Sequence, residues 1–262
     1  MPKELSPTDV AKRAAAIRAC DMVEDGMRVG LGTGSTSAFM VRRLGERVRE
    51  EGLRISGVPT SSRTGDLARA EGIEVISLDD ATWLDLTIDG ADEFDAELNL
   101  IKGGGGALLQ EKIVATASDR MVVISDASKE VNVLGAYPLP VEVIRFGWKT
   151  TKALLEETLI SLDVMGRTAA LRQNADAPYL TDEGNYILDL SLKRIGNVRN
   201  LALVLNQIPG LVENGLFIDI CDAVVIGHGD GRVETRDLSA GTTTDGPHDD
   251  GVPENLFTDL AD

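Results

Sequence analysis

The stretch "MRVGLGTGSTSAFMVRRLGERVREEG" (residues 27–52) passes from a short apolar run through a glycine-rich loop into a helical pattern. The apolar run predicts a β-strand. Ser35 or Thr36 predicts the start of a helix, because a hydroxyl side chain caps free backbone N–H groups. The same order of strand, polar loop and helix is repeated up to about residue 130. The predicted strands are 27–32, 53–61, 73–78, 83–92 and 120–128, and the predicted helices are 9–22, 35–52, 61–72 and 107–118.

Strands that alternate with helices favour an α/β fold, with a mostly parallel sheet covered by helices on both faces. After Val131 the pattern changes to that of a small α+β domain, and "CDAVVIG" (221–227) again predicts a buried parallel strand. We therefore expect an α/β domain of residues 1–131 and 219–236, with a smaller inserted α+β domain at 132–218. Residues 237–262 are rich in Gly, Thr and Asp and predict a disordered acidic tail.

The chain is strongly acidic, with a formal net charge of −17 from 43 acidic and 26 basic residues. Such a surface repels nucleic acid and anionic membranes, so neither is expected as a partner, and it suits a protein adapted to high salt. No run of 18 apolar residues is present, and residues 1–20 form a charged amphipathic segment rather than a signal peptide. We expect a cytoplasmic protein.

The positions of the cysteines and histidines argue against catalytic or metal-binding roles for them. Cys20 and Cys221 lie far apart without C-x-x-C spacing, which predicts core residues and not a disulfide or a zinc site. The two histidines are His228, among glycines, and His248, in the predicted tail, so neither forms a catalytic pair with Ser or Cys.

The glycine-rich loop "GLGTGST" (Gly30–Thr36) lies between a predicted strand and a predicted helix. Backbone N–H groups at a helix start, together with the hydroxyls of Ser35 and Thr36, form a cradle for a phosphate group. The loop is neither a dinucleotide fingerprint, because Ser35 stands where a third glycine is needed, nor a Walker loop, because it lacks the lysine. A single phosphate is favoured over a nucleotide, and a tight turn without ligand is the alternative.

The segment "DGADEFD" (89–95) begins where an apolar strand ends. Asp89 and Asp92 are suited to accept hydrogen bonds from the hydroxyl groups of a polyol or to move protons. A metal role is also conceivable for an acidic cluster, but the calcium-loop pattern is absent. The alternative is a turn with solvated carboxylates, and we assign the nearby Glu93, Asp95 and Glu97 to the surface.

The segment "KGGGGALLQEKI" (Lys102–Ile113) is the most unusual in the chain. Consecutive glycines allow the backbone to approach a small ligand and to offer N–H groups to a developing oxyanion. Lys102 carries positive charge to an anion, and Glu111 is a candidate general base if its surroundings raise its pKa. A flexible turn followed by a helix with a surface glutamate is the alternative.

Lysines are scarce, with only eight in the chain, so each is a more informative candidate for binding an anion. "SDASK" (Ser125–Lys129) ends a predicted strand, which places Lys129 at the carboxyl edge of the sheet. Ligands bind outside the carboxyl ends of the strands in open α/β sheets. Lys129 is therefore a second candidate cation for a phosphate group, the alternative being an ordinary solvated lysine.

Together, "GLGTGST", "DGADE", "KGGGGALLQEKI" and "SDASK", in this order, resemble ribose-5-phosphate isomerase of type A. The resemblance covers about residues 8–232 and extends to "PLPVEV", "GNYILDL" and "IPGLVENGLF". It implies a Rossmann-like catalytic domain with a mostly parallel sheet and a smaller inserted α+β (ferredoxin-like) domain. It also implies an aldose–ketose isomerase that interconverts D-ribose 5-phosphate and D-ribulose 5-phosphate without metal or cofactor. It also implies a homodimer or homotetramer, and either the pentose phosphate route or carbon fixation as pathway. The acidic tail departs from the family's usual ending.

The resemblance assigns roles to matching positions. Glu111 matches the general base, and Lys12 matches an N-terminal lysine that helps to bind phosphate. The implied catalytic residues are Glu111, Asp89, Asp92 and Lys102. The implied substrate-binding residues are Lys12, Thr33, Gly34, Ser35, Thr36, Asp89, Gly90, Ala91, Asp92, Lys102, Gly103, Gly104, Gly105 and Lys129.

The reaction requires a base at a weakly acidic C–H bond and stabilisation of an enediolate oxyanion. Glu111 would supply the base, the glycine loop and Lys102 the stabilisation, and Asp89 and Asp92 the proton transfers that open the sugar ring. Lys102 fits either the phosphate or the enediolate. Three rivals are a non-catalytic sugar-phosphate sensor, a coenzyme A transferase and an amino-sugar-phosphate deaminase. The sensor would need a DNA-binding segment, and the sequence contains none. The deaminase would need a catalytic histidine, which the sequence also lacks.

Overall fold

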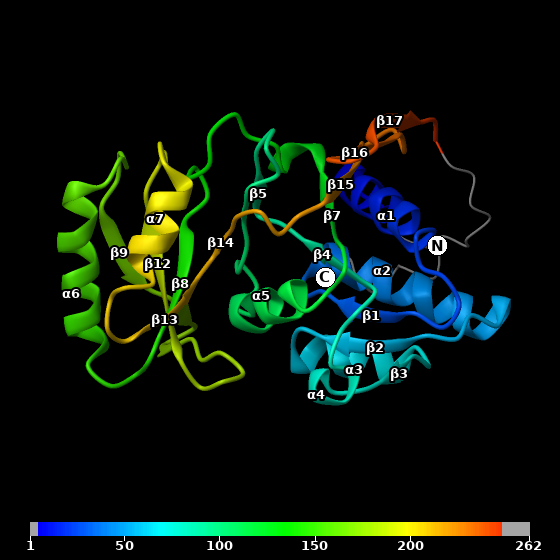
Figure 1. Ribbon diagram of the computed structural model, residues 1–262, viewed down its shortest axis with the longest axis horizontal. Helices are drawn as coiled ribbons and strands as arrows, with labels where there is room; N and C mark the ends of the chain where they lie inside the picture. The colour runs from blue at the N-terminus through cyan, green and yellow to red at the C-terminus, as the bar shows by residue number, and fades with distance from the viewer. Residues whose placement is uncertain (1–4, 248–262) are drawn as a thin grey trace. The chain divides into compact units, whose positions relative to one another are not determined.

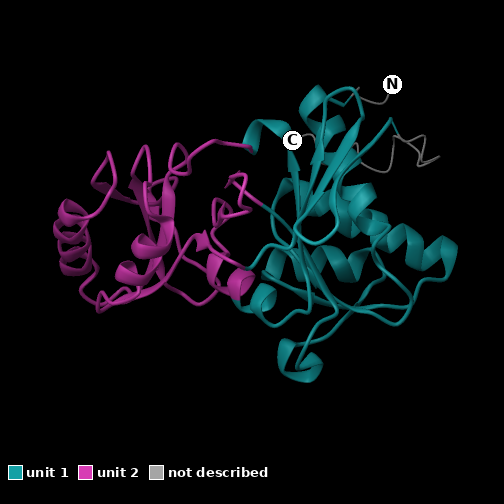
Figure 2. Ribbon diagram, turned by 45° about the horizontal axis from the view of Figure 1, so that its top comes forward, with its two compact units in different colours: residues 1–90, 113–129, 220–262 teal, residues 91–112, 130–219 magenta. Residues whose placement is uncertain are grey.

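The computed structural model describes residues 5–247 of the chain. It contains two compact units, coloured separately in Figure 2. Unit 1 comprises Met1–Gly90, Ile113–Lys129 and Ile220–Asp262, and unit 2 comprises Ala91–Lys112 and Glu130–Asp219. The small domain expected at 132–218 thus corresponds to the larger part of unit 2, but the segment 91–112 also groups with that unit.

Unit 1 is built on an eight-stranded sheet, which confirms the predicted α/β class with a mostly parallel sheet (Figure 1). Neighbouring strands from β3 to β15 in this sheet pair in parallel, and β16 and β17 continue it with antiparallel pairing. In spatial order they are β17 (Gly241–Asp245), β16 (Val233–Asp237), β15 (Ala223–Gly227), β7 (Met121–Asp126), β4 (Leu86–Gly90), β1 (Arg28–Leu31), β2 (Ser56–Pro59) and β3 (Glu74–Val75).

Helices cover both faces of this sheet, as a parallel sheet requires. On one face lie α1 (Pro7–Cys20), α2 (Ser35–Glu46), which η1 (Arg47–Glu51) continues, and α3 (Ser62–Ala70); their apolar side chains join a core with Val29 and Leu31. A Cβ at Gly30, the residue between those two, would instead meet Val114 of α5 (Leu108–Thr116). Since neighbouring strand residues point to opposite faces, α5 covers the second face, together with α4 (Leu78–Ala81).

The strand order of unit 1 creates a point where the direction of winding reverses. From β1 the chain moves outward through β2 and β3, and it then returns to the other side of β1 with β4 and β7. Ligands in open α/β sheets bind outside the carboxyl ends of the two strands at such a switch point. In this protein those ends are the residues after Leu31 and the end of β4 at Gly90.

Unit 2 has a core of its own, formed by a four-stranded antiparallel sheet and two helices (Figure 1). The sheet order is β13 (Leu211–Asn214), β8 (Leu139–Val143), β12 (Tyr186–Ser191) and β9 (Thr168–Leu171), and the helices are α6 (Trp148–Thr158), followed by η3 (Leu159–Ser161), and α7 (Val198–Leu205). Smaller pairings are made by β5 (Glu93–Phe94), β6 (Leu100–Ile101) and β14 (Leu216–Phe217), and by β10 (Gln173–Asn174) with β11 (Ala177–Pro178).

The prediction that residues 237–262 are disordered is wrong for the first part of this segment. β17 pairs along its whole length with β16, and Asp245 accepts a hydrogen bond from the Arg18 guanidinium of α1 at 3.1 Å. Four consecutive residues with short polar side chains, Thr242–Asp245, concealed this strand, because low hydrophobicity predicts disorder. The rest of the predicted tail, residues 248–262, lies outside the described residues.

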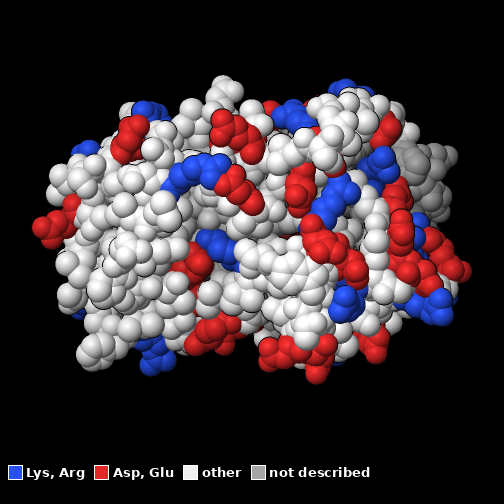
Figure 3. Space-filling model, in the orientation of Figure 1, with Lys and Arg blue, Asp and Glu red and all other residues white. Residues whose placement is uncertain are grey.

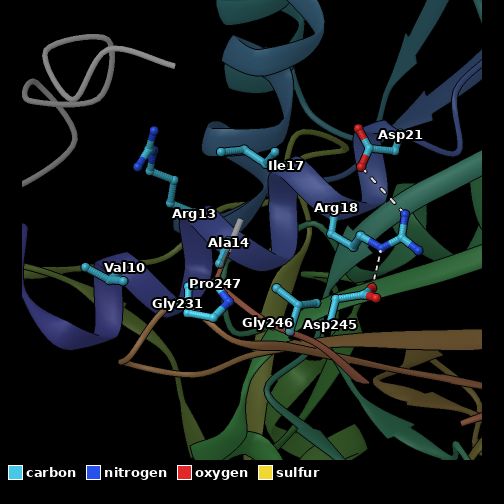
Figure 4. Close-up of a pocket in the computed structure, with 11 residues that line it drawn as sticks. Val10, Arg13, Ala14, Ile17, Arg18, Asp21, Gly231, Asp245, Gly246 and Pro247 are labelled. Carbon is cyan, nitrogen blue, oxygen red and sulfur yellow. Dashed lines mark hydrogen bonds and ion pairs between the residues drawn. The ribbon is translucent and has the colours of Figure 1, made fainter. Parts of the chain in front are cut away.

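A cavity of about 550 Å³ lies beside this hairpin (Figure 4). Val10, Ala14 and Ile17 of α1 contribute apolar side chains to its lining, and Pro247 lines it as well. Arg18 points between Asp21 and Asp245, at 3.6 and 3.1 Å. None of the predicted site residues lines this cavity.

The surface carries acidic and basic side chains interspersed, as the face in Figure 3 shows. Many of them form ion pairs, such as Arg43 with Glu46 at 2.9 Å and Arg47 with Glu51 at 3.0 Å. Cys20 and Cys221 are buried thiols, as the sequence predicts. Among the described residues, no helix is long and apolar enough to span a membrane.

Candidate active site

Asp89 stands at the switch point of unit 1, fully buried at the end of β4. Its Oδ1 accepts hydrogen bonds from the Gly90 N–H at 2.7 Å, the Thr33 N–H at 3.1 Å and the Ser37 hydroxyl at 3.3 Å. A Cβ at Gly32 would overlap the Asp89 carboxylate, so only glycine allows this approach between the two strand ends. Asp89 and the loop after β1 therefore form one rigidly bonded group.

The loop after β1 leads into the N-terminus of α2. Gly34 takes a φ of +119° just before the helix, a value that only glycine adopts without strain, and it provides no side-chain cap. The Lys12 Nζ of α1 lies 3.1 Å from the Ser35 Oγ at the first helical position. Amide N–H groups, the positive end of the helix dipole and an ammonium group thus meet at one point, which suits a phosphate.

A network of hydroxyl groups holds Thr33, and sequence reasoning missed three of its members. The Thr33 Oγ1 lies 2.8 Å from the Thr60 Oγ1, 2.9 Å from the Ser61 Oγ and 3.1 Å from the Thr64 Oγ1. These residues follow β2, the neighbour of β1 in the sheet. The run of hydroxyl residues where a predicted strand ends and a predicted helix begins was the signal that could have identified them.

Lys129 lies at the same edge of the sheet. It ends η2 (Ala127–Lys129), which follows β7, and β7 pairs with β4. Its side chain is half-buried. Lys129 thus occupies the predicted edge, at the carboxyl end of the strand next to Asp89.

In unit 2, Lys102 and Glu111 form a buried ion pair. The Lys102 Nζ lies 3.5 Å from the Glu111 Oε2, and only 2% and 3% of the two side chains are exposed. The ammonium also lies 5.4 Å from the centre of the Phe217 ring. Long charged side chains are almost never fully buried without a partner, and here each of the two residues is the partner of the other.

Contacts with other residues of the protein constrain the backbone of the four glycines between Lys102 and Glu111. Gly103 and Gly106 take φ values of +100° and +85°, which favour glycine. A Cβ at Gly104 would overlap the Asp92 carboxylate and the Tyr137 hydroxyl, and a Cβ at Gly106 would overlap the Tyr179 ring. The need for glycine here arises from packing within unit 2, in addition to any contact with a ligand.

Asp92 and three residues outside the predicted site hold this loop. The Gly104 N–H donates to the Asp92 Oδ2 at 2.7 Å. The Arg172 guanidinium donates to the Gly103 and Gly104 carbonyls and pairs with Asp189. The Tyr179 hydroxyl donates to the Gly105 carbonyl at 3.3 Å. Arg172, Tyr179 and Asp189 could not be found from sequence, because they lie far along the chain from the loop.

The residues beside Glu111 are anchored on both sides. Gln110 donates to Glu183, and the Lys112 ammonium donates to Glu213 at 2.8 Å and to the Asn214 carbonyl at 2.6 Å. Burial lowers the pKa of Lys112, although the Glu213 carboxylate opposes this effect. These bonds fix the start of α5, and with it the position of Glu111.

Unit 2 contains a further buried carboxyl group, that of Glu142 on β8. Its Oε1 accepts hydrogen bonds from the Thr181 hydroxyl and the Asn185 amide, both at 2.9 Å. Burial raises the pKa of Glu142, and these two hydrogen bonds only partly offset the effect. Glu142 pairs in register with Glu213 of β13, the partner of Lys112.

One surface assignment is wrong. Glu93 is buried in β5, where its carboxylate accepts hydrogen bonds from the Gly135 N–H at 2.7 Å and from the Tyr137 N–H. Asp95 is half-buried and Glu97 is exposed. A glutamate that bonds to two backbone amides has a structural role in unit 2, which its position in an acidic run concealed.

The predicted site residues fall into two groups, one on each unit. Unit 1 carries Lys12, Thr33, Gly34, Ser35, Thr36, Asp89, Gly90 and Lys129, and unit 2 carries Ala91, Asp92, Lys102, Gly103, Gly104, Gly105 and Glu111. Within 5–247, no group of three His, Cys, Asp or Glu side chains is arranged to hold a metal ion. The first group suits a phosphate, and the second suits proton transfer beside a developing negative charge.

Comparisons with known proteins agree with one another. The family model described as ribose 5-phosphate isomerase A (phosphoriboisomerase A) matches residues 56–231. A curated relative from Ruegeria pomeroyi, named ribose-5-phosphate isomerase A, is 73% identical over 262 residues and 100% of each chain. A solved ribose 5-phosphate isomerase from Plasmodium falciparum has a TM-score of 0.82 at 34% identity, over 87% of this chain and 98% of its own. A solved D-ribose-5-phosphate isomerase in complex with phospho-erythronic acid has a TM-score of 0.77 at 39% identity, over 90% of this chain and 97% of its own.

Proposed function

The chain belongs to the ribose 5-phosphate isomerase A family and is an aldose–ketose isomerase, and from this premise we propose how it acts. It interconverts D-ribose 5-phosphate and D-ribulose 5-phosphate through an enediolate, with Glu111 as the general base. The reaction moves one proton between C2 and C1 of the open-chain sugar. It therefore needs a carboxylate that takes and returns the proton, and groups that stabilise the negative oxygen formed in between.

The observation that carries the proposal is the buried pair of Lys102 and Glu111. Their charged atoms lie 3.5 Å apart with almost no exposure to water. When Glu111 takes the proton from carbon it becomes neutral, and the negative charge moves to the substrate oxygen. Lys102 then stabilises that oxygen, and since little water screens the charges, the interaction is stronger than in solution. This pairing favours the enediolate over the phosphate as the partner of Lys102.

The phosphate group binds at the N-terminus of α2, where its charge meets the first amide N–H groups. Lys12 supplies a positive charge 3.1 Å from the Ser35 hydroxyl. Lys129, at the end of the strand beside β4, supplies a second. Binding the phosphate by these fixed groups orients the sugar for the reaction.

Asp89 and Asp92 bind the sugar hydroxyls and open the furanose ring by proton transfer. They are three residues apart in the chain, so their Cα atoms lie within about 11 Å of each other in any arrangement of the two units. Asp92 also accepts a hydrogen bond from the Gly104 N–H, which links it to the glycine loop.

The experiment is to mix the protein with D-ribose 5-phosphate and a chelator of divalent metals and to follow ketose formation. We expect turnover that added metal does not increase. No ketose under these conditions, with the protein folded, would refute the proposed reaction. We also expect a cytoplasmic homodimer or homotetramer, which light scattering on the purified protein checks for the oligomeric state.

A further inference from the structure

The glycine loop contains a tight turn whose central peptide can face two ways. The Gly106 N–H donates to the Gly103 carbonyl at 3.0 Å, so Gly104 and Gly105 are the central residues of a β-turn. The two common turn types differ mainly in the direction of the peptide between the central residues. Glycine at both positions removes the side-chain preference that would normally select one direction. Another part of the protein must make that selection.

The Arg172 guanidinium selects the direction. Its Nη1 donates to the Gly103 carbonyl at 2.9 Å and to the Gly104 carbonyl at 3.0 Å. The Gly104 carbonyl belongs to the central peptide, and the two bonds draw both carbonyls to one side. In a planar trans peptide the N–H points opposite to the C=O. The Gly105 N–H therefore points away from Arg172.

This N–H is available to a ligand. Gly105 is exposed, and within the described part of the chain its N–H donates to no protein acceptor. The neighbouring Gly104 N–H, in contrast, is already used by Asp92. Gly105 is thus the glycine whose N–H fits an oxyanion.

Arg172 is itself held in place from behind. Its Nε donates to the Asp189 Oδ2 at 2.9 Å, its Nη2 pairs with the other carboxylate oxygen, and 14% of its side chain is exposed. The fixed fork of a guanidinium can bind a carboxylate on one edge and carbonyls on another, which an ammonium group cannot do. Asp189 belongs to β12, so the ion pair fixes the position of Arg172, and through it that of the turn, relative to this strand.

We propose that Arg172, fixed by Asp189, is a positioning residue that holds the Gly105 N–H toward the negative oxygen of the enediolate. This inference rests on the proposed isomerase reaction and deepens it. It assigns the oxyanion donor to one amide and its orientation to one ion pair. Arg172 acts through the turn and does not touch the substrate.

The test replaces Arg172 with Met, which keeps most of the side-chain volume and removes the hydrogen bonds. We expect kcat to fall about 10²-fold to 10³-fold, as for loss of one oxyanion donor, with KM changed less than about threefold. We expect the affinity for phospho-erythronic acid, whose carboxylate oxygens can accept a hydrogen bond from this N–H, to fall in the same direction. Competition by inorganic phosphate, which reports the phosphate site, stays unchanged. Guanidinium ion at millimolar concentration partly restores turnover in Arg172→Ala, and methylammonium does not.

The matched control is Arg194→Met, which breaks an exposed ion pair with Asp163 in the same unit and should leave kcat unchanged. If Arg172→Met does not fold, Asp189→Asn provides the second variant, with a smaller fall in kcat at unchanged KM. A kcat within about threefold of the wild type in a folded Arg172→Met protein overturns the inference, as does a loss that resides wholly in KM. Absence of turnover in the wild type would refute the proposed reaction instead, so the two failures are distinguishable.

Discussion

Lys102 and Glu111 form an ion pair whose charged atoms lie 3.5 Å apart while only 2% and 3% of their side chains are exposed. Burying two charges costs several kcal/mol for each ion, and hydrophobic residues of similar size are often more stabilising at such a position. A pair that stability alone does not favour, beside a loop with an exposed amide, is better explained by chemistry. This relationship supports our proposal that Glu111 is the base and that Lys102 stabilises the negative charge that develops beside it.

The first prediction concerns Glu111→Gln. Glutamine keeps the size of the side chain but cannot take a proton from carbon, so kcat should fall at least about 10²-fold. Binding of inorganic phosphate should be retained, because the proposed phosphate site lies on other elements. Steady-state kinetics and equilibrium binding check both statements. The matched control, Glu157→Gln, changes an exposed residue of α6 and should leave both quantities unchanged.

Because the substitution leaves Lys102 buried beside a neutral amide, the melting temperature is measured together with kcat. Near-normal turnover in a folded Glu111→Gln protein would remove Glu111 from the role of base.

The second prediction concerns Gly104→Ala. The added Cβ would overlap the Asp92 carboxylate and the Tyr137 hydroxyl, so the Asp92 side chain must leave its bond to the Gly104 N–H. Displacement of a positioned group by about 1 Å can cost on the order of 10²-fold in rate. We expect a fall in kcat/KM of at least about tenfold, measured with ribose 5-phosphate. Gly246→Ala, where a Cβ meets nothing within 4 Å, is the control.

The third prediction concerns the buried Glu142. Burial raises its pKa in the folded state above the unfolded value of about 4.3, so the folded protein binds more protons between these two pKa values. The stabilising contribution of neutral Glu142 is therefore complete below about pH 4.3 and is lost as the pH rises through the folded pKa. Glu142→Gln cannot titrate, so its difference from the wild type should change with pH in that window.

Urea unfolding of both proteins between about pH 4 and 8 measures this difference, because other titrating groups are common to both. The free energy of unfolding of the wild type should fall relative to the variant as the pH rises. A difference that stays constant over the whole range would contradict a raised pKa for Glu142.

The parts of the fold that follow from periodicity were accessible from sequence. The strand of residues 121–126 is buried throughout, and its unbroken apolar run before a polar cluster predicted both a parallel strand and its ligand-binding end. Thr242–Asp245 gave the opposite signal, since an edge strand with exposed residues on both sides has no apolar pattern to detect.

The candidate site, too, has one part that could be predicted from sequence and another that could not. Lys102 and Glu111 lie within ten residues of each other and share one short motif, so their pairing could be expected. Arg172 and Asp189 are tied to the glycine loop only by tertiary contacts across about 70 residues, and no local pattern records such contacts. For Glu93 the local pattern was misleading. The acidic run predicted an exposed side chain, but its carboxylate is buried and accepts hydrogen bonds from the backbone amides of residues 135 and 137.

The fourth prediction separates the two ends of the C-terminal region. A chain that stops after Pro247 keeps β17 and its pairing with β16, so its melting temperature and kcat should match those of the full chain. A chain that stops after Asp237 loses β17 and leaves Arg18 without Asp245. Its melting temperature should fall by at least about 3 °C, which corresponds to roughly 1 kcal/mol for a domain of this size. Scanning calorimetry on the three proteins, at high salt to screen the acidic surface, measures the shift. Equal melting temperatures for the two truncated chains would show that the hairpin adds no stability to unit 1, whereas a fall that already occurs after Pro247 would assign a stabilising role to residues 248–262.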